Sequence, residues 1–79
     1  MFIGVYDLNQ DKKYVNINRI KEFELVKVNQ DNSQHLQLVF YTIDSKVYYI
    51  NFQTDQELEL YNLIYELCNF GKCNYNNYK

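Results

Sequence analysis

The segment LQLVFYTIDSKVYYINF, residues 36–52, alternates like two β-strands around a tight turn, yet neither of its faces is polar. With Asp44 and Ser45 as the turn, outward pairing puts one face together from Gln37, Val39, Tyr41, Ile43, Lys46, Tyr48, Ile50 and Phe52. The other face receives Leu36, Leu38, Phe40, Val47, Tyr49 and Asn51. A hairpin exposed on one side alternates apolar with polar residues. Something must therefore cover the second face of this hairpin.

Three further strands are expected before this hairpin. FIGVYDL and KYVNINRI, residues 2–8 and 13–20, form a first hairpin around NQDK, and IKEFELVKV, residues 20–28, continues as a third strand. Ile20 is out of step with the alternation of this third strand, which predicts a bulge near Lys21 and Glu22. NQDNSQ, residues 29–34, is expected to be a polar loop.

A helix is predicted after the hairpin. Thr54 is a suitable N-cap, Glu57 completes a capping box, and the helix should run to about Phe70 and stop at Gly71. Its polar residues form one narrow stripe, made of Glu59, Asn62, Glu66 and Asn69. The apolar arc is thus wider than one sheet face normally covers.

These elements predict an α+β fold, in which a curved antiparallel sheet of about five strands, two hairpins plus a linking strand, carries one C-terminal α-helix. We expect a single domain over residues 1–72 and a flexible Asn/Tyr-rich tail over residues 73–79. A chain of 79 residues has a small core and little room for a buried active site.

The charge is distributed unevenly along the chain. Its formal net charge is -2, with +1 over residues 1–28 and -5 over residues 29–71. An acidic surface favours basic protein partners and disfavours nucleic acid. No secretory signal or long apolar run is present, so we expect a cytoplasmic protein without a membrane contact.

No residue group predicts catalysis, a metal site or a cofactor. His35 is the single histidine and is expected to be an exposed strand residue. Cys68 and Cys73 lack the further ligands that a zinc site requires; Cys68 is expected in the core, and Cys73 could be an exposed thiol. We therefore expect a protein that is not an enzyme and has no small-molecule substrate.

A partner-binding surface is predicted from the area that one helix can cover. If the helix packs on Leu36, Leu38, Phe40 and Val47, the residues left over are Tyr41, Tyr48, Val39, Ile50 and Ile43. Exposed together they would form a patch of a few hundred Å², which on soluble proteins marks an interaction surface. The alternative is a sheet that curls on itself and buries both faces.

The leading hypothesis is a small non-enzymatic protein–protein interaction module that binds a larger bacterial protein or a second copy of itself. The abundance of Asn and Tyr is typical of AT-rich coding sequences and adds the idea of a phage-type or mobile-element inhibitor. The alternative is a single-stranded nucleic-acid binder, in which Tyr14 stacks on a base and Lys12, Lys13 and Arg19 contact phosphates.

Overall fold

The computed structural model describes residues 1–71 and 75–76 of the chain. Its elements, in chain order, are β1 (Phe2–Tyr6), β2 (Lys12–Asn16), the 3-10 turn η1 (Ile17–Arg19), β3 (Ile20–Gln30), β4 (Ser33–Thr42), β5 (Val47–Phe52), the 3-10 turn η2 (Thr54–Gln56), α1 (Glu57–Asn69) and β6 (Tyr75–Asn76). The predicted α+β class is confirmed, because five antiparallel strands are followed by one C-terminal helical segment.

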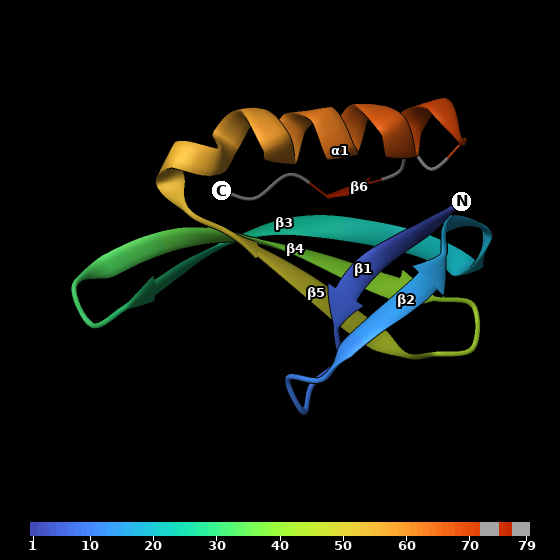
Figure 1. Ribbon diagram of the computed structural model, residues 1–79, viewed down its shortest axis with the longest axis horizontal. Helices are drawn as coiled ribbons and strands as arrows, with labels where there is room; N and C mark the ends of the chain where they lie inside the picture. The colour runs from blue at the N-terminus through green and yellow to red at the C-terminus, as the bar shows by residue number, and fades with distance from the viewer. Residues whose placement is uncertain (72–74, 77–79) are drawn as a thin grey trace.

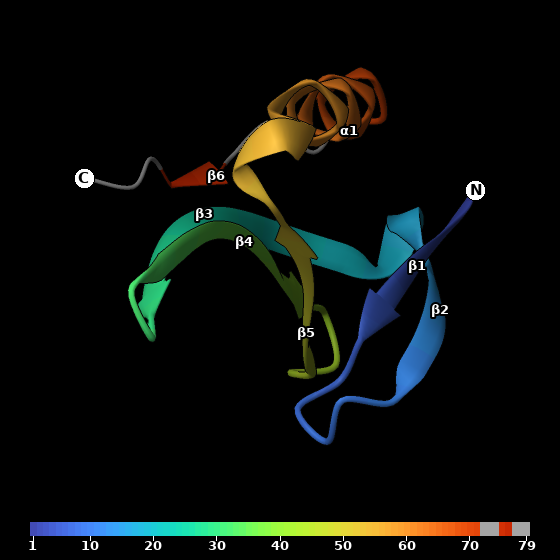
Figure 2. The same cartoon turned by 60° about the vertical axis from the view of Figure 1, so that its left-hand side comes forward.

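The strands lie in the order β2-β1-β5-β4-β3-β6 (Figure 1). β1 joins β5 through a single residue pair, Tyr6 opposite Tyr49, so the β1–β2 hairpin turns away from the rest of the sheet. Figure 2 shows β3 and β4 as a strongly bent ribbon with α1 above it and the β1–β2 hairpin at its side. The sheet is thus curved, as the sequence predicted.

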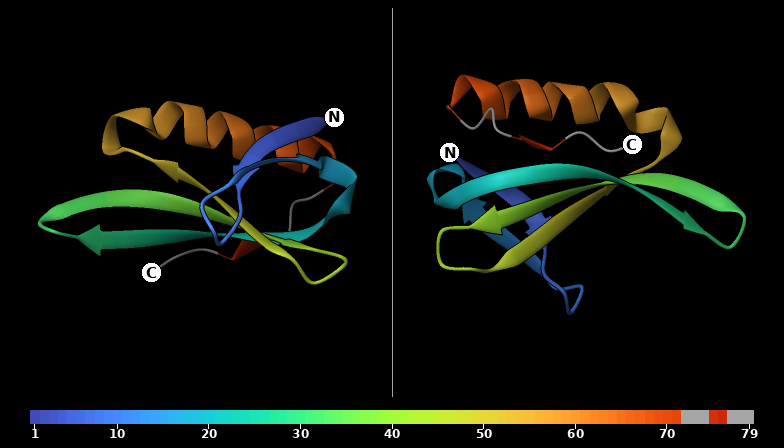
Figure 3. Two further views of the ribbon diagram at one scale, coloured as in Figure 1. Left: turned by 60° about the horizontal axis from the view of Figure 1, so that its bottom comes forward. Right: turned by 180° about the vertical axis from the view of Figure 1, so that it is seen from behind.

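β3 and β4 form one long hairpin, so the prediction of a loop over residues 29–34 is wrong. Pairing continues to Gln30 opposite Ser33, and only Asp31 and Asn32 make the turn. Both have positive φ, 49° and 66°, as the two central residues of a type I′ turn require. Asp and Asn tolerate this conformation, so a polar stretch closes as a tight turn. The tip extends past the start of α1 (Figure 3).

The strand expected over residues 13–20 is shorter than predicted. β2 ends at Asn16, whose side chain accepts a hydrogen bond from the backbone N–H of Asn18 at 3.0 Å and starts η1. This turn buries Ile17 completely. The predicted bulge is confirmed, because the β3–β4 register shifts between Ile20 and Glu22.

The turn between β4 and β5 is one residue longer than expected, so the pairing predicted for this hairpin is wrong. The N–H of Thr42 donates to the carbonyl of Lys46 at 3.0 Å, which leaves a three-residue loop with Ser45 at a φ of 67°. Such loops end in a left-handed residue, and Ser fills that position here. The observed partners are Leu36↔Phe52, Leu38↔Ile50, Val39↔Tyr49, Phe40↔Tyr48 and Tyr41↔Val47. A shift of one residue turns one strand of the pair over, which changes the composition of each face.

The cap of the helical segment is Gln53, one residue before the predicted cap Thr54. The Gln56 side chain accepts a hydrogen bond from the N–H of Gln53 at 2.9 Å, so these residues take the place expected for Thr54 and Glu57. The C-terminal end agrees with the sequence, since Gly71 has a φ of 82° and its N–H donates to the carbonyl of Cys68 at 3.0 Å.

The core lies between α1, one face of β3, β4 and β5, and the inner side of the β1–β2 hairpin. Its members are Ile3, Val5, Ile17, Ile20, Phe23, Leu25, Leu38, Phe40, Phe52, Leu60, Ile64 and Leu67. Cys68 is half-buried against it, in line with the core position expected. Cross-strand partners share a face, so Leu38, Phe40 and Ile50 all point toward α1.

Most of the expected flexible tail, including Cys73, lies outside the described residues. Of residues 73–79 the structure describes only Tyr75–Asn76, whose backbone pairs in parallel with Phe23 and Glu24 of β3. Within residues 1–71 and 75–76, no helix has the length and apolar character needed to span a bilayer.

Candidate protein-binding surface

A single row of cross-strand partners runs over the sheet face that points away from α1. Its members, from β2 to β3, are Lys12, Tyr6, Tyr49, Val39 and Glu24, each directly opposite the next. Together with the neighbouring Tyr14 and Tyr41 we call these residues the tyrosine face. The row starts with a cation, ends with a carboxylate and is aromatic and apolar between them. The second face of the β4–β5 hairpin is thus covered by side chains of this row.

The centre of the row is sealed by its own side chains. Val39 is only 8% exposed although α1 lies on the other side of the sheet. Tyr49 and Tyr41 beside it are half-buried, and the rings of Tyr6 and Tyr49 lie 6.0 Å apart. Aromatic side chains on neighbouring strands cover a small residue between them in this way. The tyrosines thus hide the middle of the face and leave its rim exposed.

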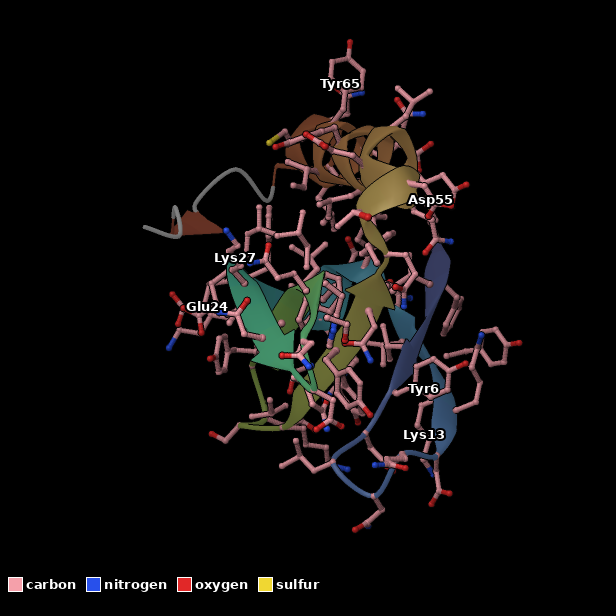
Figure 4. All side chains as sticks on the ribbon, turned by 90° about the vertical axis from the view of Figure 1, so that its left-hand side faces the viewer. Tyr6, Lys13, Glu24, Lys27, Asp55 and Tyr65 are labelled. Carbon is pink, nitrogen blue, oxygen red and sulfur yellow. The ribbon has the colours of Figure 1, made fainter. Side chains whose placement is uncertain are left out.

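One end of the tyrosine face holds a lysine between two rings. The Lys12 ammonium lies 5.2 Å from the Tyr6 ring centroid and 5.8 Å from that of Tyr14, within the range of cation–π attraction. Tyr6 is labelled in Figure 4; it is 37% exposed, and Tyr14 is 70% exposed. Gly4, opposite Tyr14 in the β1–β2 hairpin, leaves room for the lysine chain, because a Cβ there would lie 2.9 Å from Cε of Lys12.

Gly4→Ala is expected to displace Lys12 with little effect on stability, because the atom in the way is the end of a flexible side chain. The ring-current shift of the Lys12 ε-methylene protons, measured by NMR, should be lost while the melting temperature stays within a few degrees. The Lys13 resonances are an internal control, since Lys13 lies on the opposite side of β2. Unchanged Lys12 shifts would contradict the stacked arrangement.

The other end of the tyrosine face is fixed by a hydrogen bond. The Tyr41 hydroxyl donates to Oε1 of Glu24 at 2.6 Å. This bond, with burial and the nearby Glu22 carboxylate, raises the pKa of Tyr41 to about 12, because the acceptor carboxylate disfavours ionisation of the phenol. The bond fixes the ring beside Val39.

Tyr41→Phe should lower the free energy of unfolding by about 1 kcal/mol at neutral pH, because it removes this bond. The folded-state pKa lies above the ordinary value of 10.0, so the folded protein holds the proton more tightly than the unfolded chain. The hydrogen bond therefore contributes fully to the free energy of unfolding below pH 10, and this contribution disappears as the pH rises toward about 12. Urea unfolding of both proteins at pH 8 and at high pH measures it, and a pH-independent difference would contradict the bond.

The residues predicted to form one partner-binding patch are divided between two faces. Val39 and Tyr41 belong to the tyrosine face, while Tyr48 and Ile50 point toward α1 and pack against the core. Ile43 lies in the turn and is 62% exposed. The turn of three residues instead of two caused the error. The same shift brings Tyr49 opposite Val39, where it was not expected. Tyr6 and Lys12 were missed for this site because only the long-range β1–β5 contact brings them to it.

The residues predicted to contact nucleic acid are also divided. Lys12 and Tyr14 share the tyrosine face, but Lys13 lines an open hollow of about 550 Å³ on the other side, with Lys46 and Tyr48. The Arg19 guanidinium lies 3.3 Å from a carboxylate oxygen of Asp44. The Thr42 hydroxyl and this arginine hold the pKa of Asp44 below its ordinary value.

His35 lies half-buried in β4 opposite Val28, where an exposed residue was expected. Among residues 1–71 and 75–76, no three His, Cys, Asp or Glu side chains lie close enough together to hold a metal ion. No protein-family model, no curated protein and no solved structure matches this chain. The tyrosine face thus remains the best-defined candidate site of this small α+β domain.

Proposed function

We propose that this chain is a small non-enzymatic protein-interaction module that binds a larger protein through the tyrosine face. The supporting observation is the row from Lys12 to Glu24, which crosses five strands with rings at its centre and opposite charges at its ends. Tyrosine suits such a position because its ring supplies apolar area while its hydroxyl retains a polar partner.

The exposed aromatic area at the rim of the tyrosine face is too small to form a stable interface alone. Phe2, on the same side of β1 as Tyr6, is 63% exposed; with Tyr6 and Tyr14 it presents on the order of 350 Å² of ring surface. Burying this area would contribute about 9 kcal/mol, which is comparable with the cost of association, about 4–15 kcal/mol. A stable interface covers about 800 Å² on each partner. The rings therefore form the centre of the contact, and the partner also has to engage the charged ends of the row.

The finer proposal is that this binding inhibits or redirects a bacterial protein in the manner of a phage or mobile-element inhibitor. The small size of the chain, its acidic second half and its AT-rich residue usage support that idea.

The test compares proteins captured from a lysate of the source cells by the wild-type chain and by Tyr6→Ser/Tyr14→Ser. Leu8→Ser is the matched control, because Leu8 is 73% exposed in a turn outside the tyrosine face. We expect at least one protein to be captured by the wild type and the control and to be depleted at least tenfold with the double variant. Identical captured sets, or no specific capture, would contradict the proposal.

A second candidate function is binding of single-stranded nucleic acid at the basic end of the same face. The Lys12 ammonium near the rings of Tyr6 and Tyr14 supports this function, since bases could stack on the rings and one phosphate could contact the ammonium. Because the row contains a single cation, the binding constant would depend weakly on salt. A plot of its logarithm against the logarithm of the salt concentration would have a slope of only about -0.7 to -1. Anisotropy of a labelled oligonucleotide at several salt concentrations separates the two functions, and no binding at low salt would rule out this one.

A further inference from the structure

The outward side of α1 carries large apolar side chains where a surface helix normally carries polar ones. Leu58, Tyr61 and Tyr65 are 75%, 46% and 69% exposed. Their spacing of three and four residues places them on one line along the helix, which we call the outer stripe. Tyr65 points away from the sheet (Figure 4). The sequence predicted an apolar arc wider than one sheet face covers, and this stripe is the part left over.

Within residues 47–71, the charged side chains near the outer stripe all have one sign. Between Val47 and Gly71 there is no lysine or arginine, while Asp55, Glu57, Glu59 and Glu66 are all exposed. Asp55 and Glu57 are explained by the helix start, where carboxylates interact favourably with the helix dipole. Glu59 also lies in the first turn of α1 and accepts a hydrogen bond from the Gln56 side chain at 3.4 Å, whereas Glu66 lies far from the helix start. Neither of these two has a cation four residues further on to pair with.

The apolar and acidic positions repeat at the same interval. Leu58 and Tyr65 are seven residues apart, and so are Glu59 and Glu66, which corresponds to about 10 Å along the helix for each pair. A partner helix that carries apolar and basic residues at a seven-residue interval would match both rows at once.

We propose that the outer stripe is a second docking surface and that it binds a basic amphipathic helix of a partner protein. A second copy of this chain fits poorly, because α1 packed on α1 would bring the carboxylates of both copies together without a cation between them. The tyrosine face lies on the other side of the sheet from α1, so both surfaces can be occupied at once. This surface does not depend on the function proposed for the tyrosine face.

The test uses a fluorescein-labelled helical peptide in which Leu and Lys repeat at seven-residue intervals, titrated with the full chain and followed by anisotropy. The wild type should bind it, and should bind a scrambled peptide of the same composition at least tenfold more weakly. Leu58→Ser/Tyr65→Ser should weaken binding at least tenfold, and Glu59→Gln/Glu66→Gln should weaken it and flatten its salt dependence. Leu8→Ser is the matched control and should bind like the wild type, because it removes an exposed apolar side chain outside both surfaces.

Three results would overturn the proposal. The first is no binding of the amphipathic peptide, and the second is equal binding of the scrambled one. The third is a wild-type dimer in sedimentation equilibrium that Leu58→Ser/Tyr65→Ser converts to a monomer, which would assign the stripe to self-association. Circular dichroism melts of each variant must show the wild-type fold, which is expected because all the substituted side chains are exposed.

Discussion

Phe40→Ala is expected to remove about 3–5 kcal/mol from the free energy of unfolding, the cost of deleting a buried ring and leaving a cavity. Phe40 is 1% exposed and its ring lies 6.3 Å from that of Phe23, at the centre of the face that α1 covers. A domain of 79 residues is stable by roughly 4–12 kcal/mol, so this single change would unfold a large fraction of the molecules.

The measurement for Phe40→Ala is urea unfolding followed by circular dichroism, with the midpoint as the readout. Phe2→Ala is the matched control, since Phe2 is 63% exposed and its loss should cost less than about 1 kcal/mol. A similar loss for both variants would mean that the face with Phe40 is not the covered one.

Leu60→Ala is expected to cost about 2–5 kcal/mol, because Leu60 is fully buried where α1 packs on the sheet. Leu58→Ala, two residues earlier on the same helix, should cost less than about 0.5 kcal/mol, because Leu58 is 75% exposed. The pair separates packing from helix propensity, since both variants make the same chemical change within α1. If Leu58→Ala were the more costly change, the helix would be rotated relative to the arrangement described.

The local signals in the sequence predicted the elements and several of their ends. The out-of-step Ile20 predicted the bulge, and Gly71 predicted the end of the helical segment, because each depends on the chain within a few residues. The helix cap differed by one residue because Gln56 can accept the same bond that Glu57 was expected to accept.

The candidate site could be predicted only in part, because it depends on register and on long-range pairing. A left-handed Ser45 lengthens the β4–β5 turn by one residue, which is enough to move Tyr48 and Ile50 to the core side. The meeting of Tyr6 with Tyr49 joins segments more than 40 residues apart in the chain, and no local pattern marks it. The sequence did indicate that the apolar residues outnumber the positions that one helix and one sheet can bury. Exposed Tyr14, Leu58 and Tyr65 show that surplus.

Crosslinking in the cell tests whether the tyrosine face contacts another protein, as we propose. A photo-crosslinking amino acid in place of Tyr6 samples the exposed rim of the face, and the same group in place of Asn18, exposed in η1, samples a surface outside it. We expect a discrete crosslinked product of higher mass from position 6 that position 18 does not give. Identical patterns from both positions, or no product from either, would contradict it.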